Sequence, residues 1–115
     1  LMIEVTVKNA IETYTGIAAY MEIPKNHPDT FAIIERVGGS QDEHISYAMI
    51  SVQVYAPSMG YAAQACDAIS QAMLYEAINE PVISSVALNA KYNATDTETK
   101  KYRYQAIFDI AYYED

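Results

Sequence analysis

Apolar residues recur with two different periods along this chain. Residues 45–56 alternate between apolar and more polar side chains, as in a strand with one buried face. Residues 59–78 carry apolar side chains at the spacing of a helix, and Ser58 before them has a hydroxyl suited to the N-cap. One-sided positions in these segments and in the last segment predict a core between sheet and helix: Ile50, Val52, Val54, Ile69, Met73 and Phe108.

The first segment fits both periods. Ile3, Val7 and Ile11 recur at helical spacing, whereas Ile3, Val5 and Val7 also alternate as in a strand. The helical pattern runs longer and meets Gly16, a residue type that commonly ends helices. We therefore expect a helix that begins near Ile3 and stops before Gly16.

Breaks in the pattern divide the rest of the chain into strands and loops. Four further segments have the composition of strands: residues 17–23, 30–37, 82–92 and 102–113. Prolines with Asn and Asp, consecutive glycines, or a polar and charged run interrupt them. These interruptions predict mobile loops at residues 25–29, 38–44 and 93–101.

The expected order of elements is helix, three strands, helix, two strands. Strands joined by short loops pair as antiparallel hairpins, and a long crossing helix packs back on the sheet. We therefore expect one structural domain over residues 1–115 of the α+β class. It should contain a mostly antiparallel sheet of about five strands, packed against one long helix and a shorter N-terminal helix.

Acidic residues outnumber basic ones, which changes the expected partners. The chain has 15 Asp and Glu against 7 Lys and Arg, giving a formal net charge of -8. DNA binding through phosphate contacts needs clustered cations, and anionic membrane surfaces attract basic segments, so neither partner is expected. No apolar run approaches the ~20 residues of a membrane span. A single cysteine, Cys66, excludes an intramolecular disulfide.

Residue types suited to catalysis or metal binding do not form a recognised pattern. The sequence lacks a phosphate-binding loop, a dinucleotide glycine motif and zinc-like Cys and His spacing. We interpret Cys66 as a small packing residue and His27 as a surface loop residue. His44 follows Asp42 and Glu43, but successive side chains in an extended segment point in different directions, which favours a solvated turn over a metal site. We therefore expect no enzymatic activity, no metal and no cofactor.

Eleven tyrosines are the most unusual feature of the composition. Tyrosine suits half-buried sheet faces and is enriched at protein interfaces. Strand propensity explains part of them, and the surplus indicates contact with another chain, as does the two-sided apolar character of residues 30–37. A plain surface position is the alternative for Glu35 and Arg36. The residues placed at or near this contact are Glu35, Arg36, Gly38, Gly39, Tyr47, Tyr55, Tyr102, Arg103 and Tyr104.

Several short segments carry a resemblance that spans nearly the whole chain. YMEIP at residues 20–24 is followed by PDTF at 28–31 and AIIERVGGS at 32–40. VQVYA at residues 52–56 precedes an alanine-rich helix, and YN at 92–93 and YRYQ at 102–105 flank a polar loop. Their order and spacing resemble the tail terminator proteins of long-tailed bacteriophages and prophages, which are also called minor tail, tail completion or neck proteins.

This resemblance implies a structural role without catalysis or cofactor. Proteins of that family form a hexameric ring that caps the tail tube, stops its polymerisation and presents the surface to which the head connector docks. The implied partners are further copies of the chain, the tail tube protein and the head–tail connector protein, with DNA passing through an acidic ring without specific binding. The implied location is the head-proximal end of the tail in the virion, after assembly in the host cytoplasm.

A closed ring needs a head-to-tail interface whose rotation closes, and a sheet that continues from copy to copy would supply one. Three other roles fit the same residues. A head–tail joining (neck) protein would bind the portal side, a small ligand-binding or enzymatic α+β domain would carry one deep pocket, and an adaptor would stay monomeric.

Overall fold

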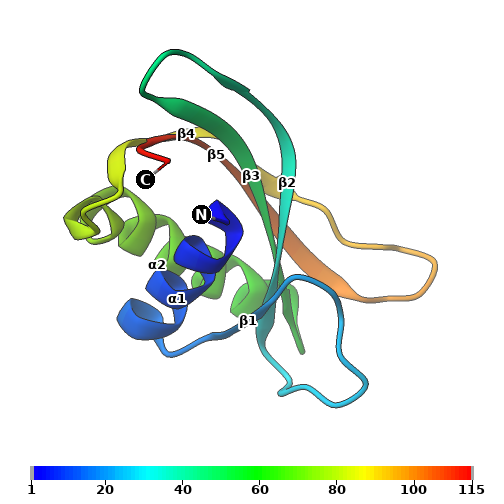
Figure 1. Cartoon of the computed structure of the whole chain (residues 1–115). Coiled ribbons are helices and arrows are strands. Elements are labelled where there is room, and N and C mark those ends of the chain that lie inside the picture. Colours follow the sequence, from blue (N-terminus) through cyan, green and yellow to red (C-terminus); the bar gives the residue numbers. More distant parts are fainter. Residues whose placement is uncertain (1, 115) are drawn as a thin grey trace.

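Two helices cover one face of a five-stranded sheet (Figure 1). The computed structural model describes residues 2–114. The helices are α1 (Ile3–Thr15) and α2 (Met59–Tyr75), and a 3-10 turn, η1 (Ala77–Asn79), follows α2. In chain order the strands are β1 (Ala18–Tyr20), β2 (Phe31–Gln41), β3 (Ser46–Ala56), β4 (Ile83–Asn93) and β5 (Tyr102–Tyr112).

The strand order across the sheet is β1-β2-β3-β5-β4. β1 runs parallel to β2, and every other neighbouring pair is antiparallel. The two hairpins, β2–β3 and β4–β5, are joined through α2, so that β5 pairs with β3 and β4 becomes the outer strand. The expected α+β class, with a mostly antiparallel sheet and two helices, is confirmed.

The main hydrophobic core lies between the helices and one face of the sheet. α2 packs on β3, β4 and β5, and α1 packs against α2, β1 and β2. All six residues expected in the core are fully buried: Ile50, Val52, Val54, Ile69, Met73 and Phe108. Within residues 2–114, no helix combines the length and the apolar character that a membrane crossing would need.

Local signals fix where the helices begin and end. The Ser58 hydroxyl accepts a hydrogen bond of 3.2 Å from the N–H of Tyr61, as expected of an N-cap. Gly16 ends α1 with a φ of 74°, which a residue with a side chain rarely adopts. The Glu12 carboxylate accepts a hydrogen bond of 3.1 Å from the N–H of Ala19, which ties α1 to the start of β1.

Two elements are shorter than the sequence predicted. The strand expected over residues 17–23 is limited to Ala18–Tyr20, because the chain then leaves the sheet in a long loop with Pro24 and Pro28. α2 ends at Tyr75 rather than near residue 78, and η1 continues the chain to Asn79.

β2 is longer than the sequence predicted. The strand was expected to end before Gly38, yet it continues to Gln41 and stays paired with β3. A bulge between Arg36 and Gly38 shifts the register, so the two glycines belong to a bent strand and not to a turn. The loop expected over residues 38–44 therefore shrinks to residues 42–45.

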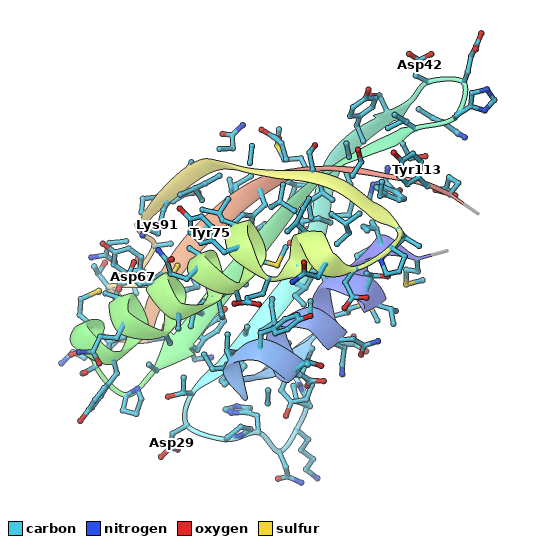
Figure 2. The ribbon with its side chains drawn as sticks, turned by 90° about the vertical axis from the view of Figure 1, so that its left-hand side faces the viewer. Asp29, Asp42, Asp67, Tyr75, Lys91 and Tyr113 are labelled. Carbon is cyan, nitrogen blue, oxygen red and sulfur yellow. The ribbon has the colours of Figure 1, made fainter. Side chains whose placement is uncertain are left out.

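The β2–β3 hairpin gives the molecule an elongated shape. The extents along its principal axes are 44, 25 and 24 Å. Figure 2 shows Asp42 at the tip of this hairpin, beyond the body of the protein, and Asp29 at the other extremity, in the loop before β2. An ion pair of 2.5 Å between Lys91 and Asp67, both labelled at the left of the same view, joins β4 to α2.

Candidate interaction surfaces

Most of the nine residues expected at an interface lie at the two ends of the β2–β3 hairpin. Nearer the tip are Gly38, Gly39 and Tyr47, and at the other end are Tyr55, Tyr102, Arg103 and Tyr104. Arg36 pairs with Ile50, midway along the hairpin. Glu35 lies between them, exposed on the face of the sheet that the helices leave uncovered. Ten residues of β2 separate the ends, which corresponds to about 30 Å at the usual strand rise.

Arg36 braces the base of the hairpin tip within its own chain. Its Nη2 donates to the carbonyl oxygen of Tyr47 at 3.3 Å, and its Nη1 donates to the hydroxyl of Tyr112 at 3.4 Å. A Cβ on Gly39 would lie 2.5 Å from that Tyr47 oxygen and would collide with the Arg36 guanidinium. A substitution of Arg36 therefore disturbs the subunit itself as well as any contact with a neighbour.

The tip of the hairpin, residues 42–45, is acidic. The N–H of Asp42 donates to the carbonyl oxygen of Ile45 at 2.8 Å and closes the turn. Asp42 Oδ1 accepts a second hydrogen bond of 2.8 Å from the N–H of Glu43. Both carboxylates and His44 are exposed. No three His, Cys, Asp or Glu side chains within residues 2–114 gather as a metal ion would require.

A stack of aromatic rings occupies the other end of the hairpin, on the helix-free face. The rings of Phe31 and Tyr55 lie parallel with their centroids 4.9 Å apart, and the ring of His27 lies 4.1 Å from that of Phe31. Arg103 donates from Nη1 to the Tyr55 hydroxyl at 3.1 Å and lies 5.7 Å from the centre of its ring. Phe31, Ile33 and Tyr55 form a second hydrophobic cluster, separate from the main core, and Tyr20 packs against it.

A hollow of about 270 Å³ opens beside this stack. We call it the aromatic groove and define it by His27, Phe31, Tyr55, Lys100, Lys101 and Tyr102, which line it. Its floor is apolar, and the two lysines come from the loop between β4 and β5. Asp29 also lines the groove, so its lining includes two basic residues and one acidic residue.

The helix-free face between the two ends is largely polar. Gln53 and Gln105 are hydrogen-bonded across β3 and β5 at 3.5 Å, and Asp109 accepts a bond of 3.0 Å from Asn89. Glu35 adds a second exposed carboxylate to this face. A second hollow, of about 480 Å³, lies nearer the hairpin tip, beside Tyr47 and Met49. This face therefore carries negative charge beside the largely apolar lining of this hollow.

Bulges interrupt the two outer edges of the sheet. β4 has register shifts between Ile83 and Ser85 and between Leu88 and Ala90. β2, whose distal half extends beyond the short β1, has its own shift after Arg36. A bulge breaks the row of hydrogen-bonding groups that a neighbouring strand would need, and edge bulges are a common protection against such pairing. The ends of the hairpin are therefore better candidates for contact than the edges.

Sequence reasoning missed part of the groove. His27, Phe31, Lys100 and Lys101 were not in the expected set, because loops separate them in sequence and only the folded register brings them together. Tyr104 points to the helix side of the sheet and packs against the main core.

Cys66 lies in α2, and its side chain is fully buried. Burial raises the pKa of its thiol to about 11, so the reactive thiolate is scarce at neutral pH. Its interpretation as a packing residue is consistent with this environment.

Comparisons with known proteins concern the fold. No family model and no curated protein matches the sequence. Among solved structures, a chain from the "Virion of native gene transfer agent (GTA) particle" superposes with a TM-score of 0.70 and 14% sequence identity. The match covers 96% of this chain and 94% of that chain. The two chains therefore share their fold over nearly their full lengths.

Proposed function

We propose that this chain is a structural protein of a phage or phage-like particle, and more specifically a tail terminator. In this role it forms a ring that caps the tail tube and docks to the head connector, and the resemblance to tail terminators implies six copies. The resemblance of its sequence segments to tail terminators supports the finer assignment. The fold shared with a chain of a gene transfer agent virion supports the broader one.

The observation that carries the proposal is the presence of two unlike surfaces at opposite ends of one hairpin. A closed ring of more than two copies needs a heterologous interface, in which one patch on each copy meets a different patch on the next. The acidic tip around Asp42 and the aromatic groove around Tyr55 form such a pair of patches. A symmetric dimer would instead need one self-complementary patch.

The helix-free face is suited to line the channel of the ring. Its exposed carboxylates, Glu35 and Asp109, would repel the phosphates of passing DNA and so prevent adhesion. Arg103 on this face is engaged with Tyr55 and with the carbonyl oxygen of Ala94, and the exposed lysines, Lys100 and Lys101, line the groove at its end. An acidic channel wall is what free passage of DNA requires.

The length of tails made without this protein tests the proposal. A tube that lacks its terminator keeps polymerising, so inactivation of the gene should give tails of irregular, excessive length. Loss of a head–tail joining protein would instead leave tails of normal length without heads. Imaging of particles from the inactivated strain and from a complemented control separates the two, and normal tail lengths would contradict the terminator assignment.

A further inference from the structure

We propose that the aromatic groove receives the acidic hairpin tip, residues 42–45, of a second copy of this chain. This assignment rests on the proposed head-to-tail assembly and names the contact that would hold neighbouring copies together. It is carried by the distribution of charge over the two ends, by the form of the tip, and by the accessibility of both surfaces.

The free cations of the molecule gather at the groove end. Within the part of the chain that the structure describes, the side chains of four of the seven Lys and Arg residues donate a hydrogen bond within the molecule: Lys8, Arg36, Lys91 and Arg103. The other three, Lys25, Lys100 and Lys101, are exposed, and two of them line the groove. In an acidic protein, ammonium groups left without an internal partner beside an apolar hollow fit an external carboxylate.

Carboxylates also lie near the groove, and their interactions bear on whether its lysines remain free to bind an external carboxylate. Asp29 lines the groove itself. Asp96, in the same loop as the lysines, accepts hydrogen bonds from the Thr99 hydroxyl at 2.8 Å and from the N–H of Glu98 at 3.0 Å. Its interactions are thus directed into its own loop, whereas Lys100 and Lys101 line the hollow.

The tip has the complementary chemistry and a suitable form. It is a narrow two-stranded projection, held in shape by the turn that Asp42 closes. Asp42 and Glu43 are exposed, and the chain has no Lys or Arg between Arg36 and Lys91. Ile45 in the tip and Tyr47 beside it add apolar surface that matches the aromatic lining of the groove.

The two surfaces cannot meet within one molecule, because about 30 Å of hairpin separates them. Each copy therefore offers its tip to one neighbour and its groove to another. Attraction is local, since whole copies with a net charge of -8 repel at long range. The contact should consequently depend on the few charges at tip and groove.

A charge exchange between the two surfaces tests the contact with the full chain. One variant, Lys100→Glu with Lys101→Glu, reverses the groove. The other, Asp42→Asn with Glu43→Lys, reverses the tip, and the asparagine oxygen keeps the acceptor for the N–H of residue 43. Glu76→Lys with Glu80→Lys is the control, since both lie on the segment that follows α2. Circular dichroism checks that each variant is folded.

Sedimentation velocity over a range of concentrations gives the readout. We expect each variant alone to need at least about tenfold higher concentration to associate than the wild-type chain or the control. An equimolar mixture of the two variants should recover association, because each reversed surface then meets an opposite charge.

Three results would overturn the assignment. If both variants associated as the wild type does, the ring would stand but this contact would not hold it. If the mixture failed to recover, the two surfaces would not be partners. If the wild-type chain stayed monomeric at every concentration, a second copy would not be the occupant, and the proposed ring would fail with it.

Discussion

Ile69 offers a direct measure of how much the packing of α2 on the sheet contributes to stability. Its side chain is fully buried in the main core, among residues of α2, β3 and β5. The substitution Ile69→Ala removes three carbon atoms, worth about 0.8 kcal/mol each in transfer free energy. The cavity left behind adds to this loss, so the free energy of unfolding should fall by about 3–4 kcal/mol.

Urea unfolding followed by circular dichroism measures this loss. With a denaturant slope of about 2 kcal/mol per molar for a small domain, the midpoint should drop by roughly 1.5–2 M. Ile78→Ala is the matched control, because Ile78 is 40% exposed and its truncation should cost about 0.5 kcal/mol or less. Ile69→Asp buries an unpaired charge and should abolish folding. Equal midpoints for the two alanine variants, or a soluble and cooperatively folded Ile69→Asp, would refute the assignment of the buried helix face.

Three further outcomes can be measured on the isolated protein. Hydrogen bonds from Lys8 and from the N–H of Ala19 hold the pKa of the Glu12 carboxyl below its ordinary value of 4.5. The ionised Glu12 carboxylate therefore stabilises the fold above pH 4.5, and this contribution is lost as the pH falls through the lowered pKa. Glu12→Gln should therefore flatten the acid limb of a curve of unfolding free energy against pH, and an unchanged limb would contradict this role. Cys66 should react with iodoacetamide at neutral pH only when urea unfolds the chain, because its thiol is buried and its pKa is raised to about 11. Rapid labelling of the native protein would contradict the burial of this thiol. Amide hydrogen exchange should be fast at residues 25–29, 42–45 and 94–101 and slow in residues 38–41, which pair with β3. Fast exchange at residues 38–41 would indicate a loop there, as the sequence predicted.

The periodic segments were the predictable part of the fold. Residues 45–56 and 59–78 each place apolar side chains on one side, and the burial of Ile50, Val52 and Val54 in β3 and of Ile69 and Met73 in α2 follows from that pattern. The pattern does not predict the burial of Ser51 and Tyr55 on the other face of β3. Gly38 and Gly39 were misjudged, because consecutive glycines indicate a turn as well as a bulge, and only pairing with β3 decides between them.

The candidate surfaces were predictable only in part. Tyrosine on a strand indicates a half-buried position but not what covers it: Tyr55 lies in the second hydrophobic cluster, whereas Tyr104 packs against the main core. The aromatic groove depends on the register that sets Phe31 opposite Tyr55 and on two loops that converge there. No local pattern encodes such convergence.

Native mass spectrometry of the concentrated full-length chain tests the central claim, assembly into a closed ring, most directly. A heterologous contact that closes gives one discrete oligomer, and the resemblance to tail terminators sets its size at six copies. We expect a species of six subunits that grows with protein concentration at the expense of the monomer of 12.8 kDa. A monomer that persists at every concentration, or an open-ended series of sizes, would contradict the ring.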